Sequence, residues 1–323
     1  MDPRLVTAII VIIGVPATVI GYVFVIEQLL KLIPARRQDS LRPWLWLLPA
    51  LLFLFVFLVY PTINTFVLSF MDKASKNFVG LNNYNYFFTS PDTLISLRNN
   101  IIWLVLLTLF AVGAGLLIAI LVDRVRFESV AKSVIFVPLA ISFVGASIIW
   151  RFVYDYQPPG EPQTGLLNAA ITTVGFSPIT WIQTAPINTI ALIVVAAWTW
   201  TGFCMVILSA ALKGISVELL EAARVDGANE LQVFRGITFP LLLPTIAVVS
   251  TTMVITALKA FDIVYVMTSG NFDTNVIANQ MYKELFTNNQ PGRASAIAVV
   301  LLLLIIPVMI INIRRFRQQE AIR

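Results

Sequence analysis

Apolar stretches of about twenty residues recur along this chain. A helix of that length crosses the hydrocarbon core of a bilayer. Helices are the expected structure there, because lipid offers no partners for the polar groups of an open sheet edge. The pattern therefore predicts an all-α, polytopic membrane protein with about seven transmembrane helices. The apolar stretches cover residues 5–27, 44–70, 99–121, 130–153, 187–212, 240–266 and 294–314.

The first stretch is either a secretory signal or a membrane anchor. Asp2 offsets Arg4, so no clearly positive segment precedes the stretch, and no Ala-x-Ala cleavage site follows it. We therefore expect an uncleaved anchor. Residues 1–43 would form this anchor helix and a cytoplasmic linker, and residues 44–323 would form a six-helix core.

A polar-rich segment, residues 213–239, separates two of the apolar stretches. Ser216 is a candidate N-cap for a first short helix. Gly227 can adopt the left-handed conformation that ends this helix, and Asn229 can cap a second one. Pro240 can begin the next span at a position where no backbone N–H is needed. We call residues 213–239 the docking segment and expect two short helices with a break, lying on the membrane surface.

The docking segment resembles the signature of ABC importer permeases, in which Glu-Ala-Ala is followed at fixed spacing by Gly, Ile and Leu-Pro. Phe239 stands where the family usually has Leu. In the family, these coupling helices (here about 214–238) dock into a cleft on a cytoplasmic ATPase. An ordinary loop helix is the alternative interpretation. The resemblance assigns ATPase coupling to Glu221, Ala222, Ala223, Asp226, Gly227, Ala228, Ile237 and Pro240.

Composition excludes several other classes of protein. The chain is 58% hydrophobic and 12% charged, whereas soluble proteins are roughly 25% charged. The pI near 9.4 does not indicate nucleic-acid binding, because the basic residues are dispersed in short connections between apolar stretches. There is no histidine, and Cys204 is the single cysteine. We therefore expect no metal site, no disulfide within the chain and no catalytic residues.

The chain also lacks the Gly-x4-Gly-Lys-Ser/Thr loop that binds ATP phosphates. It is therefore not expected to be an enzyme or to bind a cofactor itself. ATP and magnesium would be bound by a partner ATPase.

From about residue 44 onward, the chain resembles the sugar-importer permeases of the maltose and oligosaccharide type. The motifs that carry this resemblance are Leu48-Pro49-Ala50, Tyr60-Pro61, Leu68-Ser69-Phe70, Val137-Pro138, Ile149-Trp150-Arg151 and the run from Phe261 to Thr268. More narrowly, Asp262 to Thr268, Asn271-Phe272-Asp273 and Val276 to Asn279 resemble the alpha-glucoside and glucosylglycerol branch. Ser269-Gly270-Asn271-Phe272 replaces the family's usual Gly-Gly-Pro turn, which leaves the shape of that loop open.

The resemblance implies a type I ABC importer permease fold in the cell inner membrane. It also implies a heterodimer with a second, related permease, a cytoplasmic ATPase dimer and an extracytoplasmic substrate-binding protein. The expected cargo is a small neutral sugar or glycoside. Another ABC cargo, such as a polyol or glycerol phosphate, is the first alternative. A secondary transporter is the second, but it would be expected to show repeats and intramembrane carboxylates.

Polar residues inside a span usually face a partner or a water-filled path. Thr252, Thr256 and Lys259 have the spacing of one helix face, and Asp262 could neutralise Lys259. They are candidates for the substrate path. The alternative is that each threonine hydroxyl donates a hydrogen bond to the backbone carbonyl four residues earlier, and that the lysine side chain extends to the outer membrane–water interface.

A second set of candidates for the substrate path lies in the fifth span. Aromatic faces suit the C–H faces of a sugar ring, and hydroxyl groups suit its OH groups. Helix packing or an interfacial aromatic belt is the alternative. These candidates are Trp198, Thr199, Trp200, Thr201 and Phe203. The resemblance places Thr199, Trp200, Phe203, Met253, Thr256, Ala257 and Ala260 at positions that line the sugar site of the maltose-type relative, whereas alanines at 196, 197, 257 and 260 replace its sugar-binding asparagines.

Lysine and arginine set the expected orientation, because cytoplasmic connections carry an excess of them. Fourteen of the 22 basic residues share the side of the docking segment: Lys31, Arg36, Arg37, Arg42, Arg124, Arg126, Lys132, Lys213, Arg224, Arg235, Arg314, Arg315, Arg317 and Arg323. Arg4, Lys73, Lys76, Arg98, Arg151, Lys283 and Arg293 lie on the other side. The N-terminus is therefore expected outside and the C-terminus in the cytoplasm. The outer connections are 71–98, 154–186 and 267–293, the last with a short surface helix over 276–286.

This topology is testable by labelling. Single cysteines introduced at Ser40 and Thr164 should react with a membrane-impermeant thiol reagent from opposite sides of the membrane. Labelling of both positions from one side would contradict the seven-span arrangement.

Overall fold

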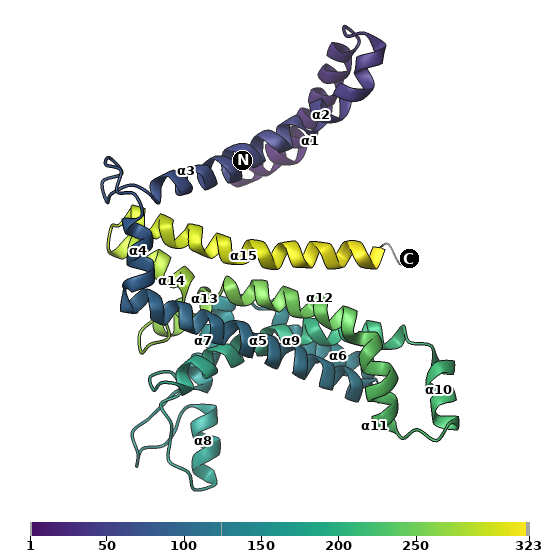
Figure 1. The fold of residues 1–323 in the computed structure, drawn as a ribbon, viewed down its shortest axis with the longest axis vertical. Coiled ribbons are helices and arrows are strands. Elements are labelled where there is room, and N and C mark those ends of the chain that lie inside the picture. The colour runs from purple at the N-terminus through teal and green to yellow at the C-terminus, as the bar shows by residue number, and fades with distance from the viewer. Residues whose placement is uncertain (1, 124, 321–323) are drawn as a thin grey trace. The chain divides into compact units, whose positions relative to one another are not determined.

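The computed structural model describes residues 2–123 and 125–320, and the chain divides into two compact units, 1–65 and 66–323. Apart from one β-bridge between Met71 and Phe78, the regular structure of the described residues is helical (Figure 1). The predicted all-α class is therefore confirmed. The boundary expected at residue 43 concerns membrane organisation and stays a prediction.

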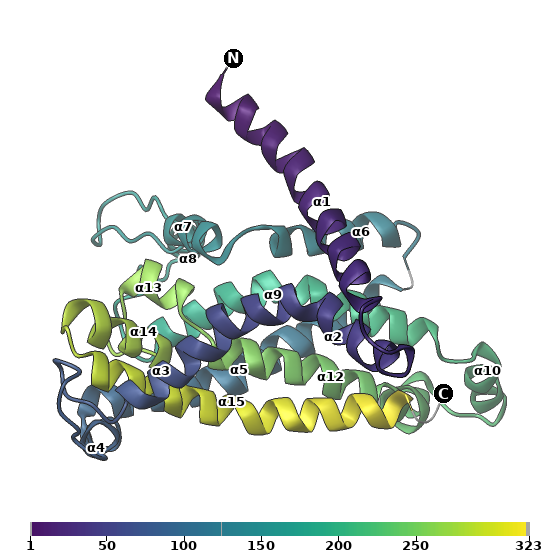
Figure 2. The same cartoon turned by 90° about the horizontal axis from the view of Figure 1, so that it is seen from above.

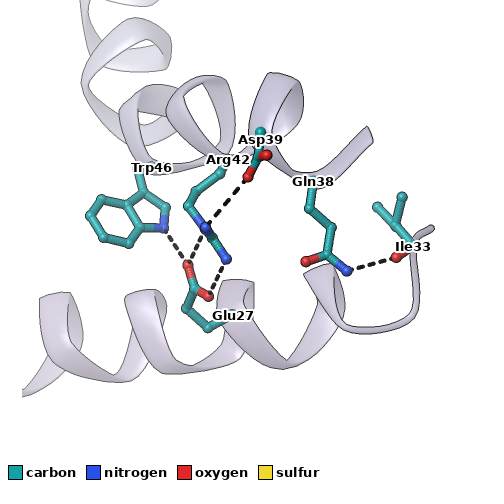
Figure 3. A network of polar contacts seen from close by, with 6 residues as sticks. All are labelled: Glu27, Ile33, Gln38, Asp39, Arg42 and Trp46. Atoms are coloured by element: carbon teal, nitrogen blue, oxygen red, sulfur yellow. Dashed lines mark hydrogen bonds and ion pairs between the residues drawn. The ribbon is translucent and has the colours of Figure 1, made fainter. Parts of the chain in front are cut away.

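The first unit contains a helical hairpin. A carboxylate fastens its two arms together: Glu27 of α1 accepts hydrogen bonds from Arg42 Nε at 3.1 Å and from Trp46 Nε1 at 3.1 Å, both on α2 (Figure 3). A charge near lipid is costly unless it is paired in this way. The pairing therefore explains how the apolar helix α1 accommodates a glutamate. The elements of this unit are α1 (Pro3–Leu30), α2 (Ala35–Leu54), the π-helical turn η1 (Phe55–Val59) and α3 (Tyr60–Leu68), which continues into the second unit.

Four long helices run side by side in the second unit: α5 (Pro91–Val122), α9 (Ile187–Lys213), α12 (Phe239–Leu258) and α15 (Pro291–Glu320) (Figures 1 and 2). Two glycines permit close packing around α9: Gly115 of α5 against α9, and Gly202 of α9 against the backbone at Ile135. A Cβ at Gly115 would lie 2.6 Å from Cys204 Cβ, and one at Gly202 would lie 2.5 Å from the carbonyl oxygen of Ile135. Small residues allow such close backbone approach in membrane bundles.

Shorter elements connect these helices. They are α4 (Asn82–Thr89), α6 (Glu128–Phe136), the 3-10 turn η2 (Val137–Ala140), α7 (Phe143–Val153), α8 (Leu166–Thr173), α10 (Val217–Val225), α11 (Glu230–Val233), the π turn η3 (Phe234–Thr238), α13 (Asp262–Thr268), α14 (Ile277–Tyr282) and the π turn η4 (Lys283–Thr287). Helices α4 and α8 lie within the predicted outer connections 71–98 and 154–186.

The fourth predicted span, 130–153, is not one straight helix. Six helices of the described residues are long and apolar enough to cross a membrane, and the pair 128–140 and 143–153 makes a seventh only as a span bent by 104°. Pro138 lies in the 3-10 turn before the bend, and Ser142 Oγ accepts from Gly145 N at 3.1 Å to start α7. A proline and a new N-cap therefore account for the break.

The limits of the sixth predicted span, 240–266, are wrong at both ends. Pro240 does not begin the helix, because one span runs over 230–258. The π turn η3 ends two residues before Pro240, and η1 ends two residues before Pro61. A proline removes a helical hydrogen bond and crowds the preceding turn, and a widened π turn accommodates this change. At the other end α12 stops at Leu258, and a separate helix, α13, begins at Asp262.

The close approach of α5 and α9 gives a matched test. Gly115→Ala should destabilise the protein by about 1–3 kcal/mol, because the new methyl group meets Cys204 Cβ at 2.6 Å and Met205 N at 2.9 Å. Gly113→Ala, on the same helix, meets no atom within 4 Å and should leave stability unchanged or slightly higher. Equal midpoints of thermal unfolding for the two variants in detergent would contradict this packing.

Candidate functional site

The docking segment has the local structure that its sequence predicts. Ser216 Oγ accepts from Leu219 N at 3.3 Å and caps α10. Gly227 has φ = +88°, the left-handed conformation that ends this helix. Asn229 and Gln232 form a capping box at the start of α11. All three expectations are confirmed. Caps and glycine turns depend on neighbours close in sequence, so the sequence alone can predict them.

The two short helices are linked by an ion pair. Arg224 Nε donates to Glu230 Oε1 at 2.8 Å across the break between α10 and α11. Both side chains are about half exposed, so the pair contributes little stability and mainly fixes the angle of the break. The Ser216 hydroxyl donates to Glu218 and holds the pKa of that carboxyl below its usual value. A groove of about 730 Å³ separates the segment from the ends of α5 and α9; it is lined by Ile120, Leu121, Asp123, Leu212, Ile215, Leu220, Arg224, Glu230, Leu231, Val233, Phe234 and Thr238.

The residues assigned to ATPase coupling are largely accessible. Glu221, Ala222, Asp226, Gly227 and Pro240 are exposed, whereas Ala223, Ala228 and Ile237 are half-buried. Apolar side chains are exposed beside them: Val225 is 87% exposed and Val217 is 60% exposed. A run of exposed apolar side chains outside the lipid-facing helices is typical of an interaction surface.

A small chamber lies where α12 ends and α13 begins. It brings together Thr256, Lys259 and Asp262, all predicted to lie on the substrate path, and has a volume of about 30 Å³. The predicted pairing of Lys259 with Asp262 is wrong: no ion pair joins them among the described residues. Lys259 follows the end of α12 and Asp262 begins α13, so the spacing that would align them on one helix does not apply. The chamber is lined by Trp103, Leu107, Phe143, Ala196, Thr256, Lys259, Ala260, Phe261, Asp262 and Ile263.

Ala260 also lines this chamber, and the remaining predicted path residues do not. Their threonine hydroxyls donate within their own helices, from Thr199 to Val195 O, Thr201 to Ala197 O and Thr252 to Val248 O. Thr256, although it lines the chamber, also donates to Thr252 O at 2.9 Å. Trp198 packs against Trp150, Trp200 against Phe203, and Met253 is fully buried. A role for these residues in the path stays a prediction.

Side-chain amides hold the connection beside the chamber, and the sequence analysis missed them. Asn100 Nδ2 donates to Ala257 O at 3.3 Å and Leu258 O at 3.4 Å, while its Oδ1 accepts from Ile277 N at 2.7 Å. Asn99 Nδ2 donates to Asp273 O at 2.6 Å. Adjacent asparagines at the start of an apolar stretch were the available signal, because buried amides need partners.

The helix expected over 276–286 exists as α14 and η4, but it is not a surface helix. Ile277, Asn279 and Glu284 are buried. Glu284 Oε1 accepts from Tyr86 Oη at 2.8 Å, Gln280 Nε2 at 3.0 Å and Asn288 Nδ2 at 3.1 Å. Three donors on one oxygen offset part of the cost of burying this carboxylate, and its second oxygen, Oε2, is buried without a hydrogen-bond partner among the described residues.

Comparisons with known proteins agree with this architecture. A family model described as "Binding-protein-dependent transport system inner membrane component" matches residues 111–314. The osmoprotective compounds uptake permease protein GgtC of Synechocystis sp. is 57% identical, covering 86% of this chain and 100% of that relative. The alpha-glucoside transport system permease protein AglF of Rhizobium meliloti is 47% identical, covering 88% and 85%.

The fold is similar to that of a chain in the crystal structure of a bacterial ABC transporter involved in alginate import, with a TM-score of 0.72 and 22% sequence identity. The match covers 86% of this chain and 99% of the alginate-transporter chain. The fold is therefore that of the permease subunit of an ABC importer. The chain belongs to the family of binding-protein-dependent transport system inner membrane components. It is accordingly a multi-pass inner membrane protein and not an enzyme.

The turn at Gly227 generates a test of the docking segment. Gly227→Pro should abolish most transport without preventing membrane insertion, because proline cannot adopt φ = +88°. Gly175→Pro is the matched control: Gly175 has φ = +89°, and neither glycine has a neighbour within 4 Å of an added Cβ. Uptake by proteoliposomes and membrane protein level are measured together. Equal transport losses in the two variants would refute the docking role.

Proposed function

We propose that this permease carries a small neutral sugar or glycoside into the cytoplasm, such as an alpha-glucoside, glucosylglycerol or a similar osmolyte. The observation that carries the proposal is the 57% identity to a permease for osmoprotective compounds over that relative's whole length. The 47% identity to an alpha-glucoside permease supports the same class of cargo.

The charges of the chamber fit a neutral cargo. Lys259 and Asp262 both line it, so one cation is offset by one anion. An anionic cargo would require an excess of lysine or arginine along the path. A phosphorylated polyol such as glycerol phosphate is the second candidate, and the one observation in its favour is that Lys259 makes no ion pair among the described residues.

The assembly that we propose has three further components. Exposed Val217 and Val225 with Glu221 give the docking segment a surface that suits a cytoplasmic ATPase dimer, which would bind ATP and magnesium. A second, related permease chain would complete the path as a heterodimer. An extracytoplasmic binding protein would deliver the cargo, as the solved alginate transporter with its bound periplasmic protein illustrates for that system.

The cargo assignment predicts the effect of two substitutions. Trp200→Ala and Thr256→Ala should each lower uptake of a neutral glucoside about tenfold, equivalent to a lost interaction of about 1.4 kcal/mol, without lowering basal ATP hydrolysis. Thr251→Ala is the control for Thr256→Ala, because Thr251 also donates to the carbonyl four residues earlier but lies outside the chamber. Trp200 also lies outside the chamber, so Trp200→Ala tests the predicted path along the fifth span separately. Uptake and substrate-stimulated ATPase activity are measured with the purified assembly over a panel of glucosides and polyols. Transport of amino acids or metal ions with no response to glucosides would refute the cargo assignment.

A further inference from the structure

Trp103 on α5 carries a polar side-chain group that no described residue contacts through a hydrogen bond. The residue is 2% exposed and lines the chamber. Its indole N–H is buried and has no hydrogen-bond partner among the described residues. A buried donor without an acceptor costs free energy, so such a group in a native protein is typically paired with a water or a ligand.

The other groups of the chamber indicate what kind of ligand would pair with this N–H. Lys259 supplies a second donor, which makes no ion pair with any described residue, and Asp262 supplies an acceptor. Apolar walls come from Leu107, Phe143 and Phe261. A neutral ring with hydroxyl groups fits this combination, because each hydroxyl both accepts and donates a hydrogen bond and the C–H faces can lie against aromatic rings.

The size of the chamber shows that such a ligand needs it to widen. Its volume of about 30 Å³ is sufficient for roughly one water molecule, whereas ligand pockets are typically 300–1,000 Å³. The chamber lies at the non-helical joint 259–261, between α12 and α13. A rotation at this joint would open it without breaking a helix. Water can satisfy Trp103 in the closed arrangement, and a cargo hydroxyl oxygen can replace that water in the open one.

We propose that Trp103 is a specificity-determining residue whose indole N–H donates a hydrogen bond to one hydroxyl oxygen of the cargo as it passes α5. The proposal rests on the proposed transport of a neutral glycoside, and it adds a contact on a helix outside the fifth and sixth predicted spans. It requires that the N–H itself, and not only the ring, acts on the cargo.

The test separates the N–H from the shape of the ring. Benzothienylalanine has nearly the shape of tryptophan but carries sulfur in place of the N–H, and it can be introduced at position 103 by stop-codon suppression. Uptake of methyl α-D-glucopyranoside is compared with uptake of its 2-, 3-, 4- and 6-deoxy derivatives in the complete assembly. Every permease variant is assayed with the same binding protein. The selectivity of the binding protein therefore does not contribute to differences between variants.

The expected result is a loss of selectivity for the hydroxyl group at one carbon of the sugar. The wild-type assembly should discriminate against one deoxy derivative about tenfold, as expected for one hydrogen bond, and the substituted assembly should not. Trp103→Phe should reproduce this profile. Benzothienylalanine at position 150 is the control, because Trp150 lies in the same core but does not line the chamber, and it should keep the wild-type profile.

The experiment distinguishes failure of the role proposed for Trp103 from failure of the proposed transport function. An unchanged profile at position 103, or an equal change for all four derivatives, overturns the role of Trp103 and leaves the proposed function standing. Failure of the wild-type assembly to take up any neutral glucoside overturns both proposals.

Discussion

The buried end of α12 is the point on which the rest of the second unit depends. A helix that ends leaves carbonyl groups without partners, and Ala257 and Leu258 are both buried there. Asn100 donates to these two carbonyls and accepts from the first N–H of α14. One side-chain amide therefore permits the break after Leu258 and positions the helix that follows. The chamber exists because of this break, since a continuous helix would place Lys259 and Asp262 on one face.

The same helix that supplies Asn100 also packs closely against α9. Gly115 lets α5 approach α9 so closely that no side chain fits between the backbones. Close packing makes this part of the protein rigid. The rigid pair α5 and α9 lies beside the non-helical joint 259–261. This arrangement suits a transporter, because motion is then confined to the joint and to α12 and α13, which it connects.

The docking segment follows a different principle. Its structure depends on local caps and a glycine turn, and it exposes apolar side chains such as Val225. Its local structure is therefore set mainly by residues close in sequence. The ion pair between Arg224 and Glu230 links its two helices across the break, and the proposed coupling role would need such a link to transmit motion.

The sequence by itself determined the helical class, the positions of most spans and the docking segment. These features follow from hydrophobic length and from caps that act over three or four residues, such as Ser216 and Asn229, so local physics is sufficient. The tertiary structure decided the break after Leu258, the burial of Glu284 and the chamber with Trp103. Asn100 lies 157 residues before Ala257, and Tyr86 lies 198 residues before Glu284. Contacts over such separations follow from how the helices pack, and the spacing of residues along one helix contains no information about that packing.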